Sequence, residues 1–171
     1  YWWASRSTSR LVQADSKGGQ KQVVPVRRGS SSRQLSSLAA GGGMLWGLSS
    51  SLLVAWSAGG GDVRWFDLAD LWKTDVWPGR LAAADGVLLV ANRPAGRWAG
   101  QIIAAHLPEL TPLQTFVVTE RPVRIGAMAG DGRYLYVQDL DAKLPELLVC
   151  RWPDEHICGA DAVNLRVAKL Q

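Results

Sequence analysis

The sequence predicts an all-β protein built from consecutive four-stranded antiparallel meanders, and three observations support this class. First, one pattern recurs over residues 44–55, 80–91 and 124–137. Second, each copy contains a short apolar run without alternation, which is typical of a strand covered on both faces. Third, Asp85-Gly86 and Asp131-Gly132 separate two apolar runs, where tight hairpin turns are expected.

Each repeat divides into four expected strands. The first strands are expected at 44–48, 81–84 and 123–128, and the second strands at 52–55, 87–91 and 134–137. The third strands are expected at 63–68, 101–107 and 146–152. The fourth, more polar strands are expected at 72–77, at 113–118, and at 156–158 or beyond.

Four antiparallel strands per unit, with the inner ones most apolar, are typical of a β-propeller blade. Residues 127–137, Ala-Met-Ala-Gly-Asp-Gly-Arg-Tyr-Leu-Tyr-Val, resemble the blade motif of the YVTN and lactonase-like propeller repeats, and residues 84–92 are a looser copy. The resemblance covers about residues 44–160 and implies blades at about 42–78, 79–119 and 120–160 in a domain of residues 38–171. It carries over no catalytic residue, because no active-site motif of the family is matched.

Three blades are fewer than the four to eight that usually close a propeller. We therefore expect a partial or oligomer-completed ring, whose open sheet faces are covered by more chain, by a second copy or by another subunit. A compact sandwich or half-open barrel is the remaining alternative.

The basic residues of the chain gather at its start. Residues 1–37 hold seven Lys and Arg against one Asp, a net charge of +6, whereas the rest of the chain carries −2. A segment rich in Ser, Gly and Arg has little apolar surface to bury, so an extended basic arm is expected over residues 1–37. Contact of this arm with a membrane or anionic lipid is one expectation, and a solvated tail is the other.

The aromatic cluster Tyr1, Trp2 and Trp3, followed by Arg6 and Arg10, is typical of a membrane-interface belt. It suggests that the arm follows a membrane segment, although packing of the aromatics on a neighbouring surface would explain it equally. The uncharged stretch 34–61 is long enough to span a bilayer. Its Gly and Ser residues, and its alignment with the other repeats, favour two buried strands instead.

Cys150 and Cys158 lie symmetrically about Asp154. A three-residue hairpin loop at 153–155 would place them on directly opposed strand positions, at the separation that a disulfide needs. A disulfide would indicate an extracytoplasmic, periplasmic or secreted protein; two buried free thiols are the alternative. A metal site using these cysteines and His156 lacks a fourth ligand, so none is expected.

Nine tryptophans are many for this length, and Trp65 and Trp72 alternate with polar neighbours, so we expect these two at the surface. Exposed aromatic and arginine side chains favour protein contacts. The interface candidates are Tyr1, Trp2, Trp3, Arg6, Arg10, Arg27, Arg28, Trp65 and Trp72.

These features favour a non-catalytic binding or assembly subunit that docks through blade surfaces and the basic arm onto a larger, membrane-associated complex. A protein partner or self-association is expected, whereas nucleic acid, cofactors and metals are not. One alternative is a lactonase-like hydrolase, which would need a metal or an acid/base group such as Asp131 or His106. Another is a carbohydrate-binding module that uses Trp65 as a stacking platform.

Overall fold

The computed structural model describes residues 2–5, 9–57, 63–73, 76, 78–93, 100–118, 123–141, 146–151 and 163–165. Nearly all of the regular structure in this part of the chain is β, which confirms the predicted class. The strands form one three-stranded sheet, three four-stranded sheets and a two-stranded ribbon, and in every sheet neighbouring strands are antiparallel and follow chain order.

The bounds follow the chain. The first sheet contains β1 (Trp2–Ser5), β2 (Arg10–Ala14) and β3 (Gln20–Pro25), and the ribbon contains β4 (Arg27–Arg28) and β5 (Ser31–Ser32). The second sheet contains β6 (Ser37–Gly41), β7 (Met44–Ser49), β8 (Leu52–Ser57) and β9 (Val63–Asp67), followed by the helix α1 (Leu68–Trp72). The third contains β10 (Pro78–Ala84), β11 (Val87–Asn92), β12 (Gln101–His106) and β13 (Thr111–Val117). The fourth contains β14 (Ile125–Gly130), β15 (Tyr134–Asp139), β16 (Glu146–Arg151) and β17 (Val163–Leu165).

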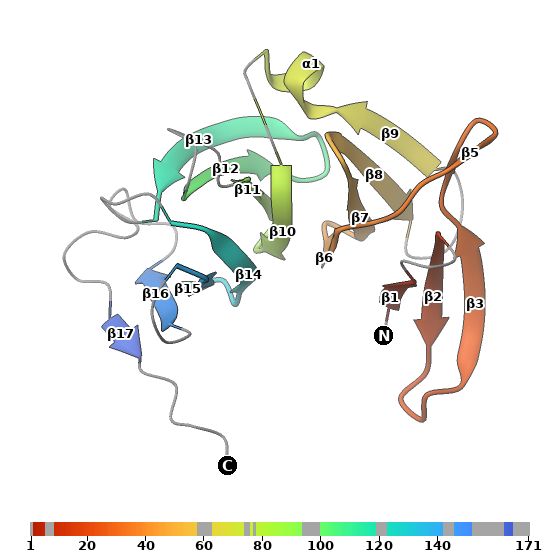
Figure 1. Cartoon of the computed structure of the whole chain (residues 1–171), viewed down its shortest axis with the longest axis horizontal. Coiled ribbons are helices and arrows are strands. Elements are labelled where there is room, and N and C mark those ends of the chain that lie inside the picture. Colours follow the sequence, from red (N-terminus) through yellow and green to blue (C-terminus); the bar gives the residue numbers. More distant parts are fainter. Residues whose placement is uncertain are drawn as a thin grey trace.

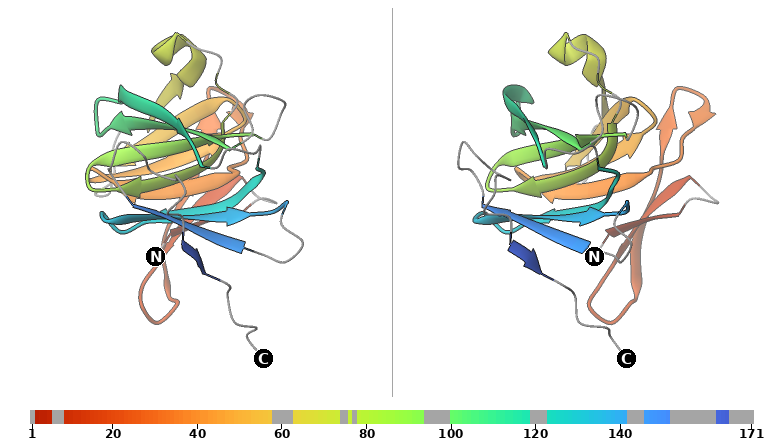
Figure 2. Two further views of the ribbon diagram at one scale, coloured as in Figure 1. Left: turned by 90° about the vertical axis from the view of Figure 1, so that its left-hand side faces the viewer. Right: turned by 60° about the vertical axis from the view of Figure 1, so that its left-hand side comes forward.

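The four sheets lie side by side in an open arc (Figure 1). The first strands of successive sheets meet at the inner edge, where β10 contacts both β6 and β14. The outer strands β9 and β13 follow the outer rim, with α1 beyond β9 (Figure 1). Two turned views show the sheets stacked on one another like slices (Figure 2).

Three hydrophobic cores fill the three spaces between successive sheets. Consecutive residues of an interior strand point into different cores: Leu88 and Val90 of β11 belong to the core shared with the second sheet, whereas Leu89 and Ala91 belong to the core shared with the fourth. Strand side chains alternate between faces, so a strand between two cores needs apolar residues at every position. This explains the non-alternating runs of the sequence.

The inner strands approach one another through small side chains. A Cβ atom built on Gly130 of β14 would lie 2.7 Å from the Cβ of Ala84 on β10. One built on Gly41 of β6 would lie 2.8 Å from the Cβ of Ala83 on the same strand. Glycine at these two positions therefore lets the sheets converge at the inner edge.

Residues 1–37 do not form the extended arm that composition predicted. Their described part folds into the first sheet and the ribbon, and Leu11 is buried there in one core with Leu45 and Val54 of the second sheet. The low average hydrophobicity hides a period-two pattern, in which Trp2, Leu11 and Val24 face that core while Lys21 and Arg28 are exposed. The chain thus contributes a fourth blade-like sheet that was not expected.

The first repeat was predicted one strand out of step. The strands expected at 44–48 and 52–55 exist, but they are the second and third of their sheet, because β6 precedes them. Gly42 and Gly43, with φ of 59° and 71°, make the turn between β6 and β7. This glycine pair takes the place that Asp85-Gly86 takes in the next sheet, so the blade begins at Ser37 and not at residue 42.

The fourth strand expected at 72–77 was also misplaced, because β9 is already the fourth strand of its sheet and α1 follows it over 68–72. The Asp67 carboxylate caps this helix by accepting a hydrogen bond from the Ala69 amide at 3.1 Å. Within 34–61 the described residues form strands, as favoured. In the described part of the chain no helix is long and apolar enough to cross a membrane.

Candidate functional site

Two hollows of about 250 Å³ each lie at one end of the strands and share Arg93 in their linings; together they are here called the rim groove. The first hollow is lined by Ser50, Ser51, Val76, Pro78 and Arg93. The second is lined by Ser36, Arg80, Asn92, Arg93, Arg124 and Leu140, among others. Because Arg93 lines both, the groove runs from the β7–β8 turn across the start of β10 to the start of β14.

Backbone carbonyls orient the three arginines of the rim groove. The guanidinium of Arg80 donates from Nε to the Gly126 carbonyl, across to the fourth sheet, and from Nη1 to the Gly79 carbonyl at 2.9 Å. Arg93 donates from Nε to the Pro78 carbonyl at 3.2 Å. Since a guanidinium has five N–H groups, both side chains keep donors for which the described residues supply no acceptor.

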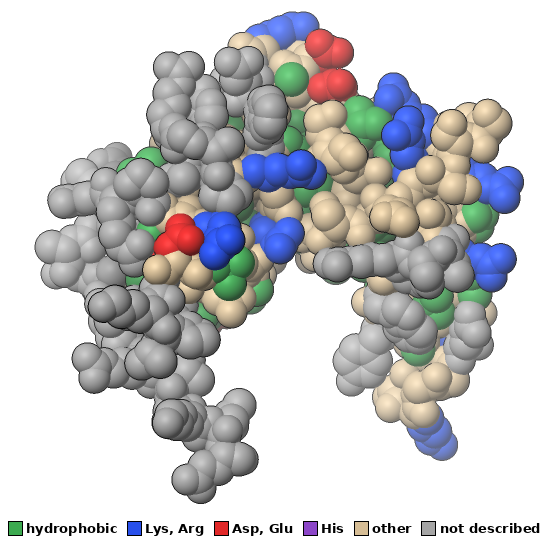
Figure 3. Space-filling view, viewed as in Figure 1, with side chains coloured by type: hydrophobic (Ala, Val, Ile, Leu, Met, Phe, Trp, Pro, Cys, Tyr) green, Lys and Arg blue, Asp and Glu red, His purple; other side chains and the backbone are tan. Residues whose placement is uncertain are grey.

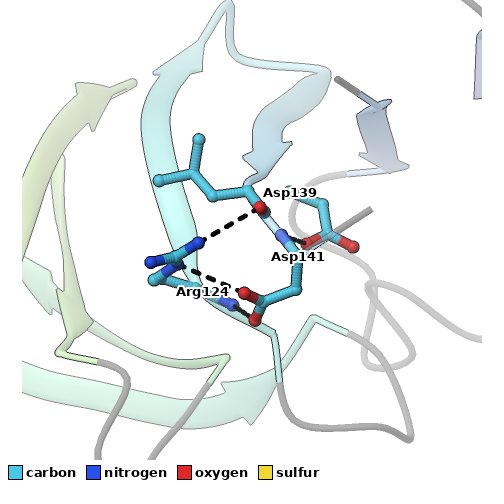
Figure 4. Close-up of polar contacts among 4 residues, drawn as sticks. Arg124, Asp139 and Asp141 are labelled. Carbon is cyan, nitrogen blue, oxygen red and sulfur yellow. Dashed lines mark hydrogen bonds and ion pairs between the residues drawn. The ribbon is translucent and has the colours of Figure 1, made fainter. Parts of the chain in front are cut away.

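Arg124 is held by a carboxylate. Its Nε lies 3.2 Å from Oδ1 of Asp141, while its backbone amide donates to Oδ2 of the same residue at 2.8 Å (Figure 4). The Asp141 amide in turn donates to the carboxylate of the buried Asp139 at 2.8 Å. Among the described residues this is the one ion pair of the groove. Of its three arginines, only Arg124 is therefore paired with a described carboxylate. Figure 3 shows Lys and Arg side chains gathered near the inner side of the arc.

The second candidate surface is the outward face of the fourth sheet, here called the end face. On β15, Leu135 and Val137 are fully buried in a core, whereas Tyr134 is 38% exposed and Tyr136 is half-buried on the opposite side. The register places Ala129 and Val149 on either side of Tyr136, and Leu147 beside Gln138. None of these end-face residues belongs to the three cores.

Asp131 organises one end of the end face. Its carboxylate accepts the backbone amides of Arg133 at 2.9 Å and Tyr134 at 2.8 Å, and the Tyr136 hydroxyl at 2.9 Å. The two amides, and then the hydroxyl, hold the pKa of Asp131 below its usual value. The same bond to Asp131 stabilises the protonated phenol and raises the pKa of Tyr136 above 10.

Replacing Asp131 by alanine is expected to lower the pKa of Tyr136 back toward 10, because the ionised carboxylate that opposes the phenolate is gone. NMR titration of the Tyr136 ring carbons measures this. Asp15→Ala is the matched control, since the Asp15 carboxylate also accepts two turn amides but touches no tyrosine. An unchanged Tyr136 titration in Asp131→Ala would contradict the assignment.

Trp65 and Trp72, expected at the surface, are partly buried and packed against cores. Their indole N–H groups donate to the backbone carbonyls of Arg27 at 3.1 Å and Leu110 at 2.8 Å, so both tie together segments distant in sequence. Trp2 likewise packs on the core of the first two sheets. These contacts leave less ring surface for a sugar or a partner than the sequence suggested.

Some of the remaining interface candidates lie among the described residues and others do not. Arg10, Arg27 and Arg28 are exposed, and the first two line a hollow of about 390 Å³ on the first sheet. Tyr1, Arg6 and the side chain of Trp3 lie outside the described residues. The arginines of the rim groove were missed, because strand ends 44 residues apart in sequence, at Arg80 and Arg124, meet only after the sheets stack.

Cys150 is buried on β16, and Cys158 lies outside the described residues. β16 pairs with β15 on one side and with β17 on the other, where Val149 lies opposite Val163, so the fourth strand of this sheet lies beyond residues 156–158. The disulfide, and the extracytoplasmic location inferred from it, stay predictions that peptide mass mapping without reduction tests.

Asp131 and His106, the residues considered for a hydrolase, are not joined in a metal site. The Asp131 carboxylate is occupied by its own hairpin, and His106 is exposed at the end of β12. In the part of the chain that the structure describes, no three His, Cys, Asp or Glu side chains are placed to hold a metal ion.

Comparison with solved structures gives similarity to U3-55K (TM-score 0.63, 15% identity, 89% of this chain and 45% of that one). It also gives virginiamycin B lyase from Staphylococcus aureus (0.61, 14%, 87% and 47%) and a chain of a nidogen/laminin complex (0.60, 13%, 88% and 56%). These neighbours are propeller and WD40-like proteins. The fold is that of a β-propeller. No family model and no curated protein matches the sequence.

The chain spans about half the length of these structures. This agrees with four sheets in an open arc, and it confirms the expectation of a propeller-like ring that the chain does not close. At these identities the likeness extends to the fold and not to an activity, and the neighbours include both a lyase and a member of a protein complex.

Proposed function

We propose that this chain is a non-catalytic binding and assembly module that docks another β-sheet on its end face. The observation that carries this proposal is the burial of β15. The interior strands β8 and β11 are buried on both sides, whereas β15 alternates between buried and accessible positions. The end face is thus a sheet surface of the kind that a further sheet covers between the other blades.

The chemistry of the end face supports contact with protein. Tyr134 and Tyr136 have ring centroids 6.3 Å apart, and Leu147 and Val149 lie on the same side of the sheet. Tyrosine is enriched at interfaces, since it buries apolar area and keeps a polar tip, and the two aliphatic side chains add apolar area beside it. The lactonase-like hydrolase and the carbohydrate module gain no comparable support.

The partner we propose is a second copy, docked through the outward side of its first sheet. Val23, which is 38% exposed, lies there opposite the buried Val12, and the exposed Arg10 begins the same strand as Val12. Arg10 is the first residue of β2, and Tyr134 is the first residue of β15. If the two copies stack their sheets as neighbouring sheets do within one chain, Arg10 of one copy lies near Asp131 of the other. In the dimer, the end face of each copy contacts the first sheet of the other. The two copies then contribute eight sheets to one ring, which is within the usual range for a closed propeller.

Sedimentation and light scattering of the chain at micromolar concentration test this assembly. The expected mass is twice the chain mass of 18.5 kDa. Val149→Asp is expected to give a monomer, because it places a charge in the buried interface without touching a core. The control Leu113→Asp, at a 45% exposed site on the outer strand β13, leaves the dimer intact. A monomeric parent chain, or a dimer unaffected by Val149→Asp, would refute the proposal.

A further inference from the structure

We infer that the rim groove binds an acidic peptide segment, with Arg93 as the central contact. This inference does not depend on the docking of the end face, because the groove lies at the opposite end of β15 from Asp131. Arg80, Arg93 and Arg124 line one hollow, and among the described residues Asp141 is the one carboxylate that pairs with any of them.

The arginines are arranged in advance of any ligand. The Nε atoms of Arg80 and Arg93 are bound to the carbonyls of Gly126 and Pro78, which fixes the planes of the two guanidinium groups. Their remaining N–H groups form a fork suited to two oxygens of one carboxylate. Gly79 allows this packing, because a Cβ at that position would lie 3.1 Å from Cγ of Arg93.

The groove itself contains an example of the recognition that we propose. The Asp141 carboxylate binds Arg124 with one oxygen and the Arg124 amide with the other. The Arg124 and Asp141 side chains are 53% and 42% exposed, so an incoming carboxylate competes at a site that solvent reaches. The same aspartate and the net charge of −2 on residues 38–171 weaken the general attraction for polyanions, so binding has to come from contacts with the positioned arginines.

The length of the groove favours a segment over a single small anion. The first hollow, on the other side of Arg93, has an apolar wall from Val76 and Pro78 and hydroxyls from Ser50 and Ser51. An extended peptide that places a Glu or Asp against Arg80 and Arg93 therefore has room to continue toward the β7–β8 turn. Hydroxyl groups there can bond its backbone.

Fluorescence anisotropy with a labelled hexaglutamate peptide, at 150 mM salt, tests the inference. Arg93→Ala is expected to weaken binding at least tenfold, and Arg93→Lys to weaken it less, since lysine keeps the charge but loses the fork. The matched control Arg28→Ala removes an exposed arginine from β4 and is expected to leave the Kd unchanged. Circular dichroism confirms that each variant is folded.

Asp141→Asn is expected to change the peptide affinity in the opposite direction to Arg93→Ala. It therefore distinguishes a change in binding from a general loss of structure. The amide oxygen still accepts the Arg124 amide, but the charge that occupies the Arg124 guanidinium is removed, so peptide binding is expected to tighten about threefold. Equal weakening by Arg93→Ala and Arg28→Ala would overturn the inference, because it would indicate non-specific charge attraction. Tighter binding of a single-stranded oligonucleotide with the same dependence on Arg93 would overturn it in favour of nucleic acid.

Discussion

Leu88→Ala is expected to lower the free energy of unfolding by about 3–5 kcal/mol. The Leu88 side chain is fully buried in the core between the second and third sheets, where it packs with Leu53, Leu81 and Ile103 among others. Truncation removes apolar contacts and leaves a cavity that two rigid sheets cannot close, because each is held on its far side by another core.

Urea unfolding followed by circular dichroism measures this loss. The control is Leu113→Ala on β13, where the leucine is 45% exposed, and a change within about 0.5 kcal/mol is expected. Similar losses for both variants would mean that the space between the sheets is not the main source of stability.

Gly130→Val is expected to destabilise the protein by about 1–3 kcal/mol, through crowding and not through a cavity. Even the first atom of the new side chain would lie 2.7 Å from the Cβ of Ala84, so β14 and β10 have to separate. Ala129→Val, one residue away on the open side of the strand, is the control and is expected to be nearly neutral.

A double-mutant cycle identifies the cause of this effect. Gly130→Ala places one methyl group against Ala84, and adding Ala84→Gly removes its opponent, so the pair is expected to recover part of the stability that Gly130→Ala loses. Additive losses in the pair would contradict crowding between the inner strands.

Strand positions were predictable wherever one residue pattern allowed one structure. The run 87–91 is apolar at every position, and the structure places it between two cores. Asp85-Gly86 and Asp131-Gly132 were expected as turns, and both hairpins form there. In these places local pattern and tertiary packing agree, so the sequence alone was sufficient.

The errors occurred where a local signal had two interpretations. Gly41-Gly42-Gly43 has the composition of a linker, yet two of these glycines make a hairpin turn at positive φ. Trp72 was expected to begin a strand, but it ends the short helix α1, which the Asp67 carboxylate caps through its bond from the Ala69 amide. Leu11 is buried by contacts with the second sheet. The composition of residues 1–37 alone gives no information about those contacts.

The candidate site was less predictable than the fold. Arg124 lies 31 residues or more from Arg80 and Arg93 in the sequence, and no motif links the three. Pairing of β10 with β11 brings Arg80 and Arg93 together in the third sheet, and stacking of the fourth sheet adds Arg124, which precedes β14. The end face was foreseen in general terms, since too few blades imply an uncovered flank, but its tyrosines were not singled out.

The sharing of strands between cores has a consequence for cooperativity. The second and third sheets each supply side chains to two cores, whereas the described residues of the first and fourth each supply one. Stability in such a stack passes from neighbour to neighbour, as in a one-dimensional lattice. Unfolding of a terminal sheet therefore disrupts one core and leaves the other three sheets packed together. Unfolding of a middle sheet disrupts two cores and separates the sheets on either side of it.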